Sequence, residues 1–192
     1  MDFALPPRPV KMRLVSGRGH YDAVIGAVQR ATRSVWVATA NLKELWIEGR
    51  RTSARSRDRY RSVLEVFDEL ATRDVELRIL HARPPSGPFR ERFEELPRLW
   101  RALELRQCPR VHLKAVIVDG AFLYLGSANW TGAGLGAKGE GRRNFELGFV
   151  TDDELMIDQV QAMYETIWRG GPCADCRLRD VCEAPLDLFE GA

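Results

Sequence analysis

Several polar side chains flank a predicted β-hairpin in the middle of the sequence. Asp119 and Gly120 separate two apolar runs at 111–118 and 121–125, and an Asp-Gly pair in this setting is a strong signal for a two-residue turn. The register that follows pairs His112 with Ser127. Residues two apart on a strand, and cross-strand partners, share a face of the sheet. The cluster expected at one end of this face consists of His112, Lys114, Ser127 and Asn129.

These residue types suit the binding and chemistry of a phosphate. The lysine supplies positive charge, the hydroxyl and carboxamide donate hydrogen bonds, and the histidine acts as nucleophile or acid near neutral pH. The His-x-Lys triplet by itself is more typical of two surface residues of an edge strand. Asp119 is five residues from Lys114, or about 16 Å at roughly 3.3 Å per residue, so within one chain we assign it to turn structure.

The spacing of these residues resembles the HKD signature of the phospholipase D superfamily. The resemblance covers about residues 10–170 and includes the segments that flank the signature. The residues that carry it are His112-x-Lys114, Asp119 after four residues, Gly126-Ser127-x-Asn129 after six more, the run SANWTGAGL at 127–135, and Asn144-Phe145-Glu146.

This resemblance implies phosphodiester hydrolysis through a phosphohistidine without a catalytic metal. His112 would attack phosphorus, and a second histidine would protonate the departing oxygen. Lys114 and Asn129 would hold the phosphoryl oxygens, with support from Ser127. Glu146 would fix the tautomer of a catalytic imidazole, although by itself it also fits a solvent-facing strand carboxylate. The catalytic set implied by the signature is His112, Lys114, Asp119, Ser127, Asn129 and Glu146.

The chain contains one such motif, whereas the implied mechanism needs two histidines. His20 and His81 lack the His-x-Lys setting. We therefore expect a homodimer with an isologous interface, in which two copies of His112 meet across the axis. Small single-motif members of the superfamily, including bacterial endonucleases and Zucchini-type enzymes, look like this. We expect a nuclease acting on DNA or RNA; a phospholipid hydrolase and a nucleic-acid-binding subunit of a larger complex are the alternatives.

Arginines crowd into one short stretch that precedes the second predicted helix. Arginine neutralises phosphates and stacks on bases, so the stretch fits a nucleic-acid contact, and a solvated surface loop fits equally well. Arg142 and Arg143 lie closer to Glu146 in the sequence. The net charge of +2 neither requires nor excludes a nucleic-acid partner. The arginines of this stretch are Arg50, Arg51, Arg55, Arg57, Arg59 and Arg61.

The four cysteines suggest a metal site. Three of them form a Cys-x2-Cys-x5-Cys run at 173–182, and Cys108 lies four residues before His112. In a reducing compartment such clustering favours metal over disulfides. The run resembles the [4Fe–4S] staple of RecB-like and CRISPR-associated nucleases, which implies a structural cluster with Cys108 as fourth ligand. A four-cysteine zinc site and metal-free thiols are the alternatives. The candidate ligands are Cys108, Cys173, Cys176 and Cys182.

Strands and helices alternate along the sequence, which predicts an α/β domain with a mixed sheet flanked by helices. The chain has 192 residues, 45% of them hydrophobic, and has neither a long apolar run nor a secretory N-terminus. We expect a cytoplasmic protein without a membrane span. The expected domains are a phospholipase D-like catalytic domain at 1–170 and a cysteine-rich metal-binding tail at 171–192. Strands are expected at 10–15, 34–40, 75–80, 103–107, 111–118, 121–125 and 145–150, and helices around 21–28, 60–71 and 89–96 and from 153 onward.

Overall fold

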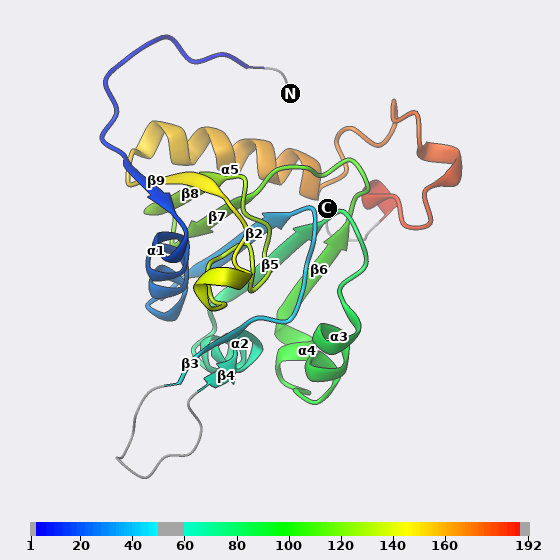
Figure 1. The fold of residues 1–192 in the computed structure, drawn as a ribbon. Coiled ribbons are helices and arrows are strands. Elements are labelled where there is room, and N and C mark those ends of the chain that lie inside the picture. Colours follow the sequence, from blue (N-terminus) through cyan, green and yellow to red (C-terminus); the bar gives the residue numbers. More distant parts are fainter. Residues whose placement is uncertain (1–2, 50–59, 189–192) are drawn as a thin grey trace.

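A seven-stranded mixed β-sheet forms the centre of the computed structural model, which describes residues 3–49 and 60–188 (Figure 1). The strand order is β1-β9-β8-β7-β2-β5-β6; β2, β5 and β6 run parallel, and the other neighbours are antiparallel. The strands are β1 Arg13–Ser16, β2 Ser34–Thr39, β3 Trp46–Glu48, β4 Tyr60–Ser62, β5 Glu76–His81, β6 Leu103–Gln107, β7 Ala115–Val118, β8 Phe122–Gly126 and β9 Leu147–Thr151. The helices are α1 Arg18–Gln29, α2 Val63–Ala71, α3 Gly87–Glu94, α4 Leu99–Ala102 and α5 Glu154–Trp168.

The sheet separates two apolar cores because the side chains of its strands alternate between faces. Along β2, Val35 and Val37 pack with α1 and α2, whereas Trp36 and Ala38 pack with α5. Helix α5 begins at Asp153, whose carboxylate accepts a hydrogen bond from a backbone amide of the first turn and so satisfies a helix-end donor. The predicted α/β class with a mixed sheet is confirmed.

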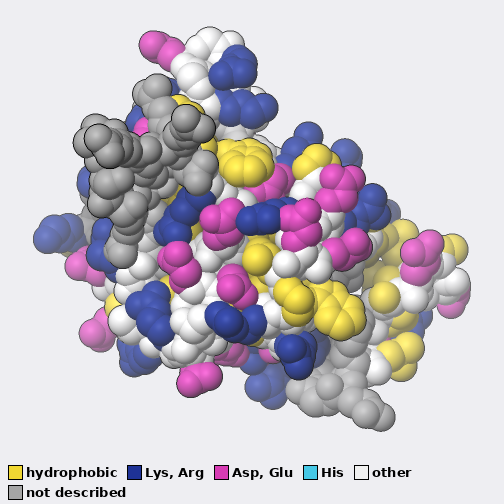
Figure 2. Space-filling view, turned by 90° about the horizontal axis from the view of Figure 1, so that it is seen from below, with side chains coloured by type: hydrophobic (Ala, Val, Ile, Leu, Met, Phe, Trp, Pro, Cys, Tyr) yellow, Lys and Arg dark blue, Asp and Glu magenta, His cyan; other side chains and the backbone are white. Residues whose placement is uncertain are grey.

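Helices α2, α3 and α4 lie at the end of the molecule seen in Figure 2, where acidic and basic side chains are intermixed. Arg92 binds Glu65 at 2.6 Å and also pairs with Glu95. Arg98 lies 3.6 Å from Asp68. Exposed pairs of this kind contribute at most about 1 kcal/mol each, but they leave these arginines already occupied by carboxylates.

The register of the β7–β8 hairpin differs by one residue from the prediction. Val118 pairs with Phe122 and not with Ala121. Asp119 and Gly120 have φ values of 57° and 63°, as an Asp-Gly turn requires, and the amide of Ala121 bonds to the carbonyl of Val118 at 3.0 Å. Ala121 therefore follows the turn as one extra residue before the ladder begins.

This shift makes the predicted pairing of His112 with Ser127 wrong. The ladder pairs Ala115 with Leu125, and residues 111–114, which we expected in the strand, have left the sheet. The convergence of the motif residues must therefore come from irregular segments around the ends of β7 and β8. Elsewhere the predicted strand at 103–107 is confirmed at its bounds.

The predicted helix at 60–71 begins three residues late. Residues Tyr60–Ser62 form β4, which pairs with β3. The hydroxyl of Ser62 then accepts a hydrogen bond from the amide of Leu64 at 3.0 Å and caps α2. The serine thus ends the strand and starts the helix.

The C-terminal tail folds back onto the main body instead of extending from it. Its far end returns to Gly170, where φ is 73° and a Cβ atom would lie 2.2 Å from the backbone of Asp187. Leu186, 2% exposed, packs in the same core as Trp168 and Val111. The boundary at residue 170 stays a prediction. The described part of the chain contains no helix long and apolar enough to cross a membrane.

Candidate active site

The His-x-Lys segment lies beside the carboxyl ends of two parallel strands. Strands β2 and β5 end at Thr39 and His81, which are neighbours in the ladder. On the other side of β2, Ala38 pairs with Ala115 of β7, and Lys114 immediately precedes Ala115 in the sequence. In open α/β sheets this edge is the usual place for ligands. Lys114 is 8% exposed, whereas His112 is exposed to solvent.

The ammonium of Lys114 contacts His112 in three ways. Its Nζ lies 3.1 Å from Nδ1 and 3.2 Å from Nε2 of the imidazole and donates to the His112 carbonyl at 2.7 Å. The two ring nitrogens face different directions, so an ammonium equidistant from both contacts the ring as a whole. Burial lowers the pKa of Lys114 and outweighs the opposing effect of the Glu146 carboxylate. The charged lysine is therefore short of solvation, which an anion would supply.

Glu146 joins Ser127 in a short polar network next to Lys114. The hydroxyl of Ser127 donates to one carboxylate oxygen, and the side-chain amide of Asn144 donates to the other at 3.1 Å. The Ser127 hydroxyl also accepts from the amide of Leu147 at 3.1 Å. In the described part of the chain the Ser127 hydroxyl and the Asn144 amide, and not His112, are the hydrogen-bond partners of the Glu146 carboxylate. Its predicted role toward a catalytic imidazole stays a prediction.

Two buried residues, His20 and Tyr124, position the backbone of Glu146, and the sequence analysis did not identify either of them as functional. Nε2 of His20 lies 3.1 Å from the carbonyl of Glu146, and Nδ1 lies 3.0 Å from the hydroxyl of Tyr124. A carbonyl only accepts, so Nε2 carries the proton and Nδ1 accepts from the tyrosine. Burial raises the pKa of Tyr124 to about 12, which keeps its proton in place. His20 is 0% exposed, and this burial by itself only weakly indicates a supporting role.

Asn129 approaches the site from the side of β2. Its side-chain oxygen accepts from the amides of Ala40 at 3.1 Å and Asn41 at 3.0 Å, and lies 3.3 Å from the hydroxyl of Thr39. The same hydroxyl accepts from the amide of Trp130 at 2.9 Å. With its oxygen committed to β2, Asn129 has its NH₂ group to offer to a phosphoryl oxygen. Thr39 was missed because it reads as an ordinary strand residue.

Asp119 has no part in the site of its own chain, although the signature includes it. Its carboxylate accepts from the amides of Thr32, Arg33 and Ser34 at 2.7–3.1 Å and from the Thr32 hydroxyl at 2.9 Å. Burial alone raises the pKa of Asp119, but these hydrogen bonds outweigh it and hold the pKa below its ordinary value. The residue fastens the hairpin turn to the α1–β2 connection, and its inclusion in the catalytic set stays a prediction.

Two hollows flank the motif residues. A cleft of about 650 Å³ is lined by Ser127, Glu146, Arg143 and neighbouring loop residues. A smaller apolar pocket of about 150 Å³ has His112 in its wall and continues toward the C-terminal tail. The motif thus lies between a larger cleft and a smaller apolar pocket.

The four cysteines are free thiols, each partly buried, and all of them line one small cavity. As the side chains stand, no three His, Cys, Asp or Glu residues in the described part of the chain are grouped closely enough to hold a metal ion. Burial raises the pKa of the Cys108 thiol. The amide of Leu178 and the side chain of Arg110 lower the pKa of the Cys176 thiol.

Most of the predicted arginine stretch, Arg50 to Arg59, lies outside the described residues. Arg61, its last member, pairs with Glu69 at 2.5 Å. Arg142 is exposed, and the guanidinium of Arg143 donates to a backbone carbonyl at 2.6 Å. Of the arginines named from the sequence, Arg143 is the one that lines the cleft beside Glu146.

A mixed sheet with a His-x-Lys motif at the carboxyl ends of its strands defines the phospholipase D-like class. A family model described as "Cardiolipin synthase, PLD-like domain" matches residues 24–168. The chain belongs to this PLD-like family of phosphodiesterases. A search of curated protein sequences finds no match.

Solved structures share this fold at low sequence identity. NucT from Helicobacter pylori is 16% identical with a TM-score of 0.57, covering 82% of this chain and 95% of NucT. Nuc, a phospholipase D family member from Salmonella typhimurium, is 15% identical with a TM-score of 0.58, covering 83% and 95%. Phosphatidylserine synthase from Haemophilus influenzae Rd KW20 is 14% identical with a TM-score of 0.52, covering 82% of this chain and 38% of the synthase.

Proposed function

We propose that the protein is a nuclease that hydrolyses phosphodiester bonds of DNA or RNA through a phosphohistidine on His112, as a homodimer. The observation that carries the proposal is the contact between the exposed His112 imidazole and the buried Lys114 ammonium. An exposed imidazole is able to reach phosphorus in a large substrate. A desolvated ammonium beside it stabilises the negative charge that develops on the phosphoryl oxygens.

Cleavage in this scheme takes two balanced steps. A ring nitrogen of His112 bonds to phosphorus, the bond to the departing oxygen breaks, and a second imidazole gives that oxygen its proton. Water then attacks phosphorus, gives its proton to the second imidazole and releases His112. His20 is enclosed between Tyr124 and the Glu146 carbonyl, and His81 is 4% exposed with Nδ1 bonded to a backbone carbonyl. The second imidazole is therefore His112 of the partner subunit.

Exposed apolar side chains beside the site favour such an interface. Phe145 is fully exposed, and Leu147 is 56% exposed. They flank Glu146 in the sequence, and all three line the open cleft. Large exposed apolar side chains that lie close together are typical of a surface that another molecule covers. A second copy of the chain would cover both and place two motifs together.

Cationic groups near the cleft favour a polyanionic substrate. Arg142 is exposed and forms no ion pair with any other described residue, in contrast to the paired arginines of the face in Figure 2. Arg143 lines the cleft. Unpaired arginines next to the site are available to the phosphates of a nucleic acid.

Cleavage assays on labelled single- and double-stranded DNA and RNA, with EDTA present, test this proposal. Phosphatidyl vesicles at the same concentration serve as the alternative substrate. We expect cleavage of nucleic acid by the wild type and by Glu94→Gln, an exposed control in α3, and none by His112→Asn. Alkaline quenching should trap an acid-labile phosphoryl group on the wild type only. Activity confined to the vesicles, or full nuclease activity of His112→Asn, would overturn the assignment.

Mixed dimers test the shared site. If each active site needs His112 from both subunits, co-refolding equal amounts of wild type and His112→Asn leaves about one quarter of the dimers active, because only wild-type pairs work. Independent sites would leave about one half of the total activity. A monomer in analytical ultracentrifugation at assay concentration would also contradict the dimer.

A further inference from the structure

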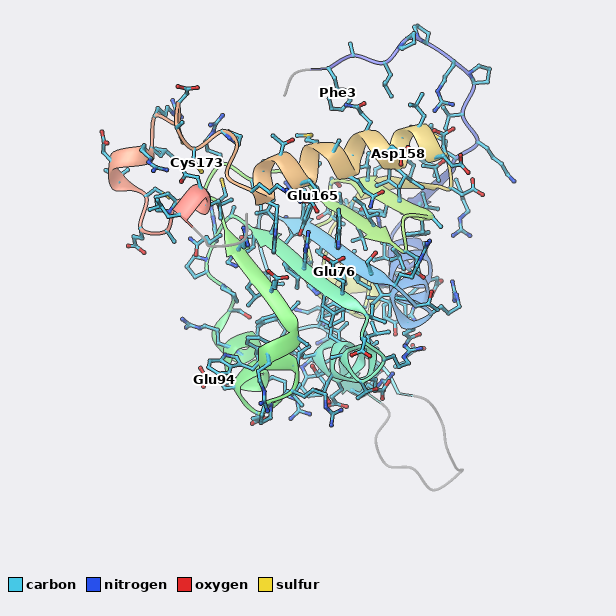
Figure 3. All side chains as sticks on the ribbon, turned by 180° about the vertical axis from the view of Figure 1, so that it is seen from behind. Phe3, Glu76, Glu94, Asp158, Glu165 and Cys173 are labelled. Atoms are coloured by element: carbon cyan, nitrogen blue, oxygen red, sulfur yellow. The ribbon has the colours of Figure 1, made fainter. Side chains whose placement is uncertain are left out.

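The four cysteines come from two distant parts of the chain and meet around one cavity. Cys108 follows β6, and the other three belong to the tail beyond α5, where Figure 3 shows Cys173 beside the end of that helix. The cavity measures about 30 Å³, and its remaining wall comes from the tail and the β6–β7 connection. Cysteines more than sixty positions apart in the sequence thus line the same small cavity.

Tight turns present these thiols. The amide of Cys176 bonds to the carbonyl of Cys173 at 3.2 Å, and the amide of Arg179 bonds to the carbonyl of Cys176 at 2.8 Å. On the other wall, the amide of Val111 bonds to the carbonyl of Cys108 at 2.9 Å. Consecutive turns of this kind position the backbone at Cys108, Cys173 and Cys176 without help from a helix or strand.

Positive groups surround the thiols. The side chain of Arg110 contacts Cys176, and Arg179 interacts electrostatically with Cys173 and Cys182. A centre built from four thiolates carries net negative charge, which such arginines offset. Arg110 comes from the same connection as Cys108, so the charge compensation also spans both walls of the cavity.

The tail has few other means of attachment. Leu186 is the main side chain that it buries against the body, whereas Val181 and Leu188 are 77% and 67% exposed. An irregular segment that buries so little apolar surface cannot offset its ordering entropy by packing alone. A metal ligated by residues on both walls would supply the missing attachment, since metal-binding energy becomes folding energy in small cysteine sites.

We propose that Cys108, Cys173, Cys176 and Cys182 bind one thiolate-ligated metal centre, either an iron–sulfur cluster or a zinc ion. Binding requires the thiols to turn into the cavity that separates them, because as placed they do not yet converge on a single point. The centre fastens the tail to the segment that carries His112. Cys108, Cys173 and Cys176 share the apolar pocket of about 150 Å³ with His112, so the fastening reaches the wall of the active site.

Metal and sulfide analysis of the full chain, purified without oxygen, tests the proposal directly. About four iron and four sulfide per chain, with absorption near roughly 400 nm, identify the cluster. About one zinc per chain in a colourless protein identifies the ion. Each Cys→Ser variant should lose the metal, whereas Asp175→Asn, an exposed change between Cys173 and Cys176, should keep it. Absence of stoichiometric metal after anaerobic reconstitution with iron and sulfide, and separately with zinc, would overturn the proposal.

The readouts do not depend on nuclease activity, so this proposal and the proposed function fail separately. Cys108→Ser is the decisive variant, because only Cys108 comes from the catalytic connection. Full metal content in a folded Cys108→Ser protein would show that the tail binds metal without the body and would overturn the fastening. Backbone hydrogen exchange across 108–114 should accelerate when the wild type loses its metal, and unchanged exchange would contradict the link to His112.

Discussion

Asp119→Ala removes the carboxylate that ties the β7–β8 turn to the connection between α1 and β2. The three amides of Thr32, Arg33 and Ser34 and one hydroxyl lose their acceptor. Hydrogen bonds to a charged group contribute about 1.5–3 kcal/mol each, but water replaces part of this at a half-buried surface site. We therefore expect a loss of about 3 kcal/mol in the free energy of unfolding.

For a chain of this length, about 1 kcal/mol shifts Tm by roughly 2–4 °C, so Asp119→Ala should melt about 6–12 °C below the wild type. Asp158→Ala, an exposed change on α5 (Figure 3), is the matched control and should melt with the wild type. Urea unfolding at neutral pH gives the same comparison as a free energy. Wild-type stability of Asp119→Ala with complete loss of phosphodiesterase activity would refute the structural role and favour a catalytic one.

Acidification provides an independent check. The hydrogen bonds hold the pKa of Asp119 below its ordinary value, so the folded state prefers the ionised form. Its stabilisation is present above the unfolded pKa of about 3.9 and is lost as pH falls through the lower folded pKa. The stability gap between wild type and Asp119→Ala should therefore narrow from about pH 4 downward. A gap that stays constant to about pH 2 would show that charge plays no part.

Three further predictions concern the site and its support. Lys114→Met should lower kcat/KM on a phosphodiester by about 10²–10³-fold, whereas Lys43→Met, at an exposed position, should not. Gly148→Ala would place a Cβ atom 2.6 Å from Cε2 of Tyr124 and should lower the unfolding free energy by about 1–3 kcal/mol in urea titrations. Tyr124→Phe leaves Nδ1 of His20 without its donor and should destabilise the fold by about 1–3 kcal/mol; in the wild type, ultraviolet titration should show this phenol ionising at about pH 12.

Local signals predicted the elements well, and the hairpin register shows where they stop. The strand at 103–107 was found at its bounds because apolar residues alternate there between clear ends. The Asp-Gly turn was also identified correctly. Whether one more residue follows the turn before pairing resumes is not recorded in any local pattern. Ala121 is this additional residue, and the predicted cross-strand pairs beyond it are therefore shifted by one residue.

The proposed catalytic pair was accessible from sequence because His112 and Lys114 are two residues apart and carry their own chemistry. Their support was not accessible. His20 contacts the Glu146 carbonyl, 126 positions away, and the Tyr124 hydroxyl, 104 positions away. Contacts between residues so far apart cannot be recognised from motif spacing. The sequence offered only distance along a strand as a reason to separate Asp119 from its motif, whereas its bonds to Thr32, Arg33 and Ser34 indicate a structural role.

The segment that carries the motif has no β-ladder to hold it, so Lys114 has both a structural and a chemical task. One end is fixed where the amide of Cys108 bonds to the carbonyl of His81 at 2.8 Å, and the other where Ala115 enters β7. Between them the ammonium of Lys114 bonds to the His112 carbonyl at 2.7 Å. An ammonium has three protons. It can therefore keep the backbone of the proposed nucleophile in place with one proton while the others are available to phosphoryl oxygens, and its compact charge suits this better than a planar guanidinium.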